Sequence, residues 1–470
     1  MYPFFWPMDN RGSTTMRKDE ASAIITSGKI SSAVWFLAWP TIVNTLIQMA
    51  YGIINRMFLG RLGEQAAPSL AAAGAGERVL LVQYVMMLGV SVGTSALVAR
   101  FLGAENYDDA EEAARQSIIL STLGGIITMI PIILFANPFV KLIGTPSEVV
   151  PLATQYTVVI AYFSVPMFLT IIITAALRSA GDVRSPLYAG AIIIGLNILL
   201  DWLLIFGVGP FPMLGIIGAA LATGISRLVG MVVILWFFKR SVLGDALTCL
   251  KAHTSWFIRI ANIGWPASLQ NLIWATSSIS FWWILGRLPN ATDAQAALTI
   301  GLAIESLAYM PGIAYSMAAT PLVGQNIGAG RIDRAEHSAW IATWQAVAVI
   351  SSVAIFFLII PEYLARAFTS DISVIPLVVL YLQINAIAQP TQGIGFVLKG
   401  ALQGAGDTRI PMLISLIANW IIRLPLAYLF AITLDLGAMG AWIAMSISAS
   451  LNGVLSAIWF KWGTWRTLEV

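Results

Sequence analysis

The feature that most constrains this 470-residue chain is the length of its segments without charge. Asp201 is the only charged residue between Arg184 and Arg227, and the segment 410–460 contains only two charged residues. Each segment has room for two membrane-spanning helices, because one helix needs about 20 apolar residues. Charged residues make up 10% of the chain, whereas soluble proteins carry about 25%. The sequence therefore predicts an all-α integral membrane protein.

Hydropathy predicts twelve membrane-spanning helices in two sets of six. The first set lies near residues 33–59, 77–101, 116–136, 150–176, 186–208 and 214–238. The second set lies near residues 260–286, 297–323, 338–360, 374–398, 410–433 and 438–461. The predicted domains are a tail over 1–32, an N-lobe over 33–238, a linker over 239–259, a C-lobe over 260–461 and a tail over 462–470. We expect the linker to contain an amphipathic helix along the membrane surface.

The distribution of Lys and Arg predicts the orientation, because basic residues concentrate in cytoplasmic loops. If the N-terminus is inside, the inner segments hold 18 of the 26 Lys and Arg residues, and the outer segments hold six. Arg227 and Arg423 lie within spans. Both termini are therefore predicted to be cytoplasmic, and the protein is predicted to reside in the cell membrane.

Composition also excludes several classes of partner and cofactor. The net charge of +3, without a basic run, does not indicate nucleic-acid binding. Cys249 is the only cysteine, and His253 and His337 are the only histidines, so structural zinc and haem are not expected. We find no phosphate-binding loop for ATP and no cluster of His or acidic residues that would indicate a membrane enzyme. The sequence thus predicts no cofactor apart from a coupling ion.

The two sets of spans are copies of one another. LVARFLGA at residues 97–104 matches LVGQNIGA at 322–329, and ALRSAGDVRSP at 176–186 matches ALQGAGDTRIP at 401–411, both at a shift of 225. An even number of spans per copy makes this a parallel duplication. It predicts two pseudo-symmetric six-helix lobes around a central cavity, and rocking of the lobes would expose that cavity to either side. This arrangement favours a transporter over a channel, because a channel does not need two lobes that move against one another.

Polar residues inside the first set of spans indicate a cation site. A charge at mid-membrane is costly and usually faces a cavity or a partner, which makes Asp201 the strongest candidate. Asn197 lies on the same helix face, and Asn55 and Thr223 are expected to approach from neighbouring spans. Carboxylate, amide and hydroxyl oxygens suit Na⁺, and a desolvated carboxylate suits H⁺. Either ion is a candidate.

The second set contains Glu305 and Arg423 at similar depth. They either form a buried ion pair or line the cavity and contact substrate or coupling ion. At a repeat shift of 222, Asn197 corresponds to Asn419 and Asp201 to Arg423. Tyr51 and Asn419 are further candidates for the cavity wall.

The duplicated motifs, with Trp-Pro at residues 39–40 and 265–266, resemble the MATE family, the multidrug and toxic compound extrusion transporters, and most of all its DinF-like branch. The resemblance implies a secondary antiporter that exports amphipathic, cationic small molecules in exchange for H⁺ or Na⁺. It also supports Asn197, Asp201 and Thr223 as the N-lobe cation site. We expect a monomer. One departure is Asn55, which stands in span 1 where the family often has Asp.

The alternative function is a flippase for lipid-linked sugars or other lipids. A flippase would be expected to line its cavity with several cationic residues for pyrophosphate. Only Arg227 and Arg423 lie at mid-membrane in this chain, which favours the antiporter.

Overall fold

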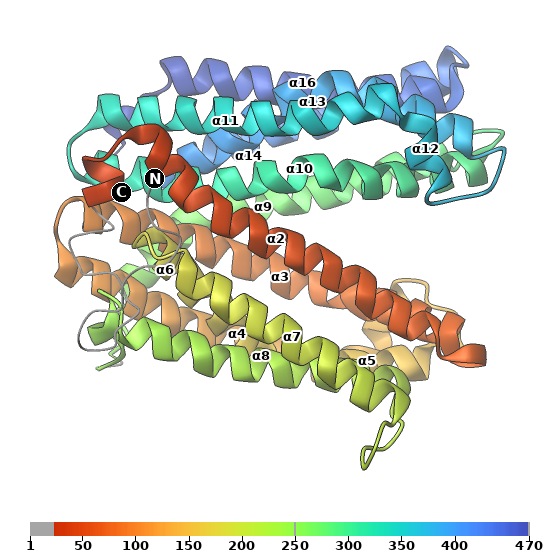
Figure 1. The fold of residues 1–470 in the computed structure, drawn as a ribbon, viewed down its shortest axis with the longest axis horizontal. Coiled ribbons are helices and arrows are strands. Elements are labelled where there is room, and N and C mark those ends of the chain that lie inside the picture. Colours follow the sequence, from red (N-terminus) through yellow and green to blue (C-terminus); the bar gives the residue numbers. More distant parts are fainter. Residues whose placement is uncertain (1–22, 249–250, 469–470) are drawn as a thin grey trace.

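The structure, a computed structural model, describes residues 23–248 and 251–468. The predicted tails therefore lie partly outside the described residues. Within them every regular element is a helix, which confirms the all-α prediction. Most of these helices are long, and Figure 1 shows them running in the same general direction.

The N-terminal half begins with three long helices and ends with two shorter ones. Its elements are α2 (Ile30–Gly60), η1 (Gly63–Gln65), α3 (Ala66–Gly103), α4 (Tyr107–Leu142), α5 (Val150–Ala161), α6 (Ser164–Ser179), α7 (Arg184–Phe206) and α8 (Gly215–Lys239). The fourth predicted span consists of two helices, α5 and α6, which meet at an angle of 51°.

The C-terminal half repeats this order. After η2 (Gly244–Leu247) of the linker, its elements are α9 (Thr254–Leu285), α10 (Ala291–Gly328), α11 (Ile332–Ile359), α12 (Pro361–Arg366), α13 (Ile375–Gly404), α14 (Arg409–Leu416), η3 (Ile417–Arg423), α15 (Leu424–Tyr428), η4 (Leu429–Thr433), α16 (Gly437–Trp462) and η5 (Thr464–Thr467). The eleventh predicted span is thus a continuous helical run from α14 to η4, in which η3 and η4 are π-helical. In the linker, the described residues form the four-residue η2, and α9 begins at Thr254.

Each of the twelve predicted spans corresponds to a helix or a helical run. Nine helices of the described chain are long and apolar enough to cross a membrane, and the bent pair α5–α6 makes ten. The remaining two are α9 and α13, which carry buried amides such as Gln270 and Gln389. Several helices are longer than predicted, because a helix continues past the apolar segment that hydropathy detects. Glu77 and Arg78, expected at the start of span 2, lie within α3, which begins at Ala66.

The turns that follow spans 4 and 10 each contain a glycine in the left-handed conformation. Gly181 and Gly406 have φ angles of 85° and 86°, which side chains disfavour. Asp182 Oδ1 accepts from the backbone N–H of Ser185 at 3.0 Å. Trp459 Nε1 donates to Asp407 Oδ2 at 3.0 Å. Burial raises the pKa of both carboxyls, although these hydrogen bonds oppose the shift.

We call the end of the molecule that holds both described chain ends the inner end; it is the predicted cytoplasmic side. In Figure 1 the two helix bundles meet at this end and diverge toward the other, outer end, where α5 and α12 lie. The halves are joined where α3 packs against α9 and α10, and where α2 packs against α10. The joining hydrogen bonds include Ser268 Oγ to the Val85 carbonyl at 2.9 Å and Gln325 Nε2 to the Ser179 carbonyl at 2.7 Å.

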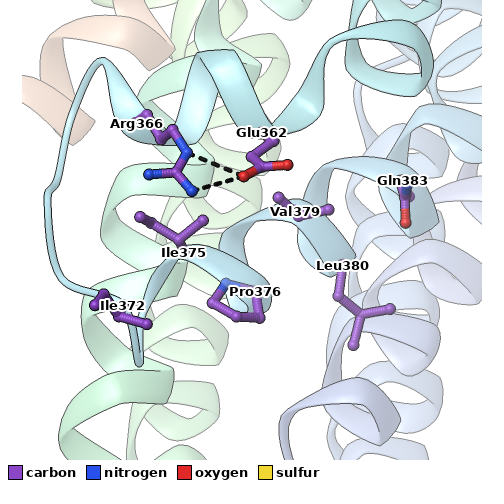
Figure 2. Close-up of a pocket in the computed structure, with 8 residues that line it drawn as sticks. All are labelled: Glu362, Arg366, Ile372, Ile375, Pro376, Val379, Leu380 and Gln383. Atoms are coloured by element: carbon purple, nitrogen blue, oxygen red, sulfur yellow. Dashed lines mark hydrogen bonds and ion pairs between the residues drawn. The ribbon is translucent and has the colours of Figure 1, made fainter.

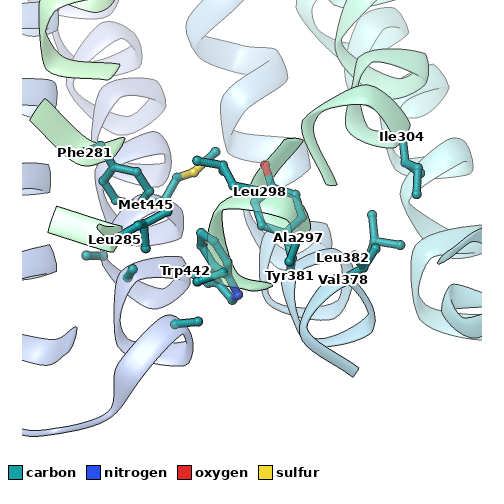
Figure 3. Packing of buried hydrophobic residues seen from close by; sticks show 14 of the residues in the cluster. Phe281, Leu285, Ala297, Leu298, Ile304, Val378, Tyr381, Leu382, Trp442 and Met445 are labelled. Atoms are coloured by element: carbon teal, nitrogen blue, oxygen red, sulfur yellow. The ribbon is translucent and has the colours of Figure 1, made fainter. Parts of the chain in front are cut away.

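Each half has its own hydrophobic core at the outer end. The C-terminal core is centred on Trp442, which packs edge-on against Tyr381 with ring centroids 5.2 Å apart (Figure 3). Phe281 lies on another side of Trp442, with ring centroids 6.3 Å apart. Every residue of this core comes from the C-terminal half. The corresponding outer core over residues 59–220 comes entirely from the N-terminal half.

At the inner end the beginning of each half's first helix packs into the other half. Ile25, Val34 and Leu37, which precede or begin α2, are buried among residues of α10, α11 and α13. Ile260 and Ile263 of α9 are buried among residues of α3, α4 and α6. The two inner cores therefore each contain residues of both halves, and they hold the inner end closed in this structure. The central cavity between the lobes stays a prediction.

Candidate functional site

In the N-terminal half, three helices bring three side chains of the predicted cation site together with Tyr51, which was predicted for the cavity wall. Asn55 Nδ2, on α2, donates to Asp201 Oδ2 on α7 at 3.3 Å and is 2.9 Å from the Tyr51 hydroxyl. That hydroxyl lies 3.4 Å from Thr223 Oγ1 on α8. Asp201 is fully buried, although Tyr51, Asn55 and Thr223 are partly exposed. The chain of contacts thus runs from the surface of the half to a buried carboxylate.

Two buried oxygens of this cluster have no hydrogen-bond donor among the described residues. They are Asp201 Oδ1 and Asn197 Oδ1, which lie one helical turn apart on α7. Buried polar atoms are almost always paired, so two orphaned oxygens on one helix face mark a place for a further partner. A proton on the carboxyl or a Na⁺ ion would satisfy them, and the residues present therefore fit the coupling ion. Asn197 joins the cluster by position and not through a hydrogen bond to Asp201.

Arg227 lies one turn beyond Thr223 on α8. Its Nη1 donates to Met167 Sδ at 2.8 Å, and no carboxylate of the described chain lies within the 4.0 Å limit for an ion pair. The N-terminal half therefore contains both an acid and a base at mid-span without pairing them.

In the C-terminal half, Glu305 of α10 is buried, with 2% of its surface exposed, and is bonded by side chains of α13. Gln389 Nε2 donates to Glu305 Oε1 at 2.7 Å, and the Tyr381 hydroxyl donates to Oε2. The ion pair with Arg423, one of the two predicted arrangements, is not formed, because no oxygen of Glu305 lies within 4.0 Å of the guanidinium. Neutral donors from α13 occupy both carboxylate oxygens instead.

Arg423 makes a different contact. Its Nε donates to Ser448 Oγ on α16 at 2.8 Å, and Ser448 in turn donates to the Met445 carbonyl at 2.9 Å. Asn419, at the repeat position of Asn197, uses its amide to bond the Ser415 carbonyl at 2.8 Å. The residues predicted for the cavity or the ion pair do not form one site. Tyr51 belongs to the N-terminal cluster, and the amide of Asn419 bonds a carbonyl of its own helical run. Glu305 and Arg423 have separate partners.

Hydropathy did not predict the π-helical segments of span 11. A π-helix within a span is rare and is frequently found at functional sites. Ser277 Oγ donates to the Asn419 carbonyl at 3.0 Å, and Trp420 Nε1 donates to the Ile273 carbonyl at 3.2 Å, so α9 holds η3 in place. The sequence signal is Pro425, which cannot donate a backbone hydrogen bond within the run.

A hollow of about 500 Å³ lies at the outer end between α12 and α13. It is lined by Glu362, Arg366, Ile372, Ile375, Pro376, Val379, Leu380 and Gln383 (Figure 2). Its charged residues are already paired, since Arg366 Nη2 lies 2.7 Å from Glu362 Oε1. None of the predicted site residues lines this hollow.

Comparison with known proteins matches both halves to one family. The model of the MatE family matches residues 40–203 and again residues 266–429. The chain belongs to the MatE family. The chain is 31% identical over 441 residues to a probable multidrug resistance protein NorM of Thermotoga maritima, covering 92% of this chain and 93% of that protein. It is 27% identical over 441 residues to an FAD transporter of Shewanella oneidensis, covering 92% and 94%.

The fold is shared with solved MATE structures. A crystal structure of MATE in complex with MaD3S superposes with a TM-score of 0.88 at 23% identity, covering 95% of this chain and 98% of that one. This likeness confirms the fold of twelve helices in two lobes. Membership of the family also makes the chain a multi-pass membrane transporter. The DinF-like branch stays a prediction.

Proposed function

We propose that this MatE transporter exports amphipathic small molecules in exchange for H⁺ or Na⁺ by alternating access, and that Asp201 binds the ion. The observation that carries the proposal is the fully buried Asp201 carboxylate, with one oxygen lacking a donor beside the orphaned oxygen of Asn197. A charge inside the membrane is stable only with a partner or near a cavity, and an exchangeable cation is such a partner. The partial exposure of Tyr51 and Asn55 supports a route for the ion.

The acid of span 1 that many relatives use is an amide here. Asn55 donates to Asp201, so Asp201 is the one carboxylate of this cluster and the residue to which we assign the ion. The names of the relatives differ between multidrug resistance and FAD transport, so they do not decide the substrate. We expect cationic amphiphiles from the family resemblance. A monomer in the cell membrane with both termini cytoplasmic completes the proposal.

The test is dye efflux from proteoliposomes with an imposed H⁺ gradient, an imposed Na⁺ gradient, or neither. We expect one gradient to drive efflux in the wild type, and Asp201→Asn to reduce efflux to the level without a gradient. The matched control is Glu77→Gln, which removes an exposed carboxylate from the same half. Efflux by Asp201→Asn that still follows the gradient as in the wild type would remove Asp201 from the mechanism.

A further inference from the structure

Arg423 has a fixed position inside the membrane. It is the last residue of η3, which α9 supports through the hydrogen bonds of Ser277 and Trp420. Ser448, which is fully buried, holds the guanidinium by its Nε edge at 2.8 Å. The same repeat position in the N-terminal half is Asp201, in the regular helix α7. The guanidinium is therefore held by α16, and the helical segment that carries it is held by α9.

The charge of Arg423 is not neutralised by a direct partner. Glu305 lies beyond 4.0 Å of the guanidinium, and both of its oxygens are bonded by Tyr381 and Gln389. Apart from the bond to Ser448, no hydrogen bond joins Arg423 to the described residues. Its side chain is partly exposed, unlike that of Glu305. The two Nη groups are consequently open to a ligand.

We infer that Arg423, oriented by Ser448, is a subsite for an acidic group, a carboxylate or phosphate, on the transported amphiphile. A guanidinium edge with two free N–H groups matches the two oxygens of such an anion and forms strong, charge-assisted hydrogen bonds with it. The inference rests on the proposed function and adds to it: substrates carry an acidic group in addition to any cationic one. An inorganic anion offers the same chemistry to this site.

The test compares two probes that differ in one group: Nε-dansyl-lysine and its primary amide. Both are fluorescent amphiphiles with an amino group, and only the first has a carboxylate. Binding is measured from dansyl fluorescence with the purified full chain in detergent. We expect the wild type to bind the acid at least about tenfold more tightly than the amide, because hydrogen bonds to charged groups are strong.

In the variant Arg423→Gln, the affinities for the acid and the amide should become about equal. Arg423→Lys should keep part of the preference for the acid, because Lys retains the positive charge but lacks the planar pair of N–H donors. The matched control is Arg227→Gln, which removes the other mid-span arginine and should leave the preference intact. Thermal unfolding verifies that each variant is folded. A wild type without preference for the acid, or an Arg423→Gln variant that retains the full preference, overturns the inference.

A further arm identifies the source of the anion. If inorganic phosphate displaces the acid from the wild type but does not affect Arg423→Gln, the site binds inorganic anions as well as substrate. Binding in detergent does not depend on coupling, so failure of the subsite is distinguished from failure of the proposed function. The latter is measured by gradient-driven dye efflux.

Discussion

Asp201 and Glu305, two buried carboxylates within the spans, differ in how many donors they have. Glu305 has a donor on each oxygen, from Tyr381 and Gln389. Asp201 has a donor on one oxygen and none on the other among the described residues. Because a buried acceptor without a donor costs free energy, Asp201 has more to gain from an added cation or proton. The partners of each acid, and not only its depth, therefore distinguish the two.

Removing the Glu305 side chain should destabilise the protein. In Glu305→Ala, Tyr381 and Gln389 lose their acceptor inside the half, and each unpaired buried group costs about 1–3 kcal/mol. Glu305→Gln should cost less, because its amide can donate to Gln389 Oε1, which has no donor among the described residues. Thermal unfolding in detergent measures both variants. Equal losses from Ala and Gln would show that these hydrogen bonds do not stabilise the fold.

At this scale the sequence predicted much of the N-terminal cluster. Hydropathy places Asp201 inside a span, and polar residues at mid-span gather because each needs a partner away from lipid. The sequence did not predict the separation of Glu305 from Arg423. Similar depth on two spans is compatible with a pair, but the rotation of each helix decides whether the side chains face one another, and that depends on packing.

Among the elements, α3 and α10 approach one another closely at two glycines. A side chain at Gly103 would meet the Gln325 carbonyl oxygen at 2.0 Å, and one at Gly328 would meet the Arg100 carbonyl oxygen at 2.0 Å. These two contacts are related by the repeat. Glycine allows helices to approach until their backbones touch, as is common between membrane helices.

Gly103→Ala should therefore weaken the inner contact. The added methyl group meets backbone atoms of α10, which cannot rotate away, so the helices must separate. The matched control on α3 is Gly74→Ala, where a methyl group meets nothing within 4 Å. Alanine favours helix over glycine by about 1 kcal/mol, so the control should be neutral or stabilising. Thermal unfolding of both variants checks this prediction, and a Gly103→Ala protein as stable as Gly74→Ala would contradict it.

Helix types were predictable only in part. Hydropathy detects an apolar segment of sufficient length and is insensitive to whether its turns are α or π, so the span over 410–433 was predicted as one regular helix. The structure divides it, and the carbonyl of Asn419 is bonded by α9 and not only within its own helix. The bend between α5 and α6 was likewise not predicted, since both helices fit within one predicted span.

On the scale of the whole molecule, arginines at the start of α11 bond the chain before α2 at the inner end, and we call this set of hydrogen bonds the clasp. Arg334 Nε and Nη2 donate to the Ile25 carbonyl at 3.3 and 3.1 Å, and Nη2 also donates to the Gly28 carbonyl. Arg331 Nη1 donates to the Thr26 carbonyl at 2.6 Å. The proposed alternating access requires this end to open, and we therefore expect these hydrogen bonds to be released in each cycle.

Arg334→Ala should shift the transporter toward an open inner end. The loss of charge-assisted hydrogen bonds predicts a population change of at least about tenfold. Spin labels at Ala104→Cys and Ala329→Cys, in a Cys249→Ser background, would report the change as longer distances across the inner end.

The matched control is Arg366→Ala. Its guanidinium pairs with Glu362 at the outer end, and both side chains are 60% exposed. Exposed pairs of this kind contribute little, so the distances should remain those of the parent protein. Identical distance distributions for Arg334→Ala and Arg366→Ala would show that the clasp does not control opening.

The duplicated motifs predicted the twelve spans and the two halves, but not which half each helix packs against. Hydropathy identifies the apolar residues of α2 and α9 without specifying their neighbours. The structure shows that the first helix of each half begins inside the core of the other. Because of this crossing, a substitution in an outer core affects the packing of one half only. A substitution in an inner core has to fit residues of both halves. The two halves are therefore expected to have diverged more freely at their outer ends than at their inner ends.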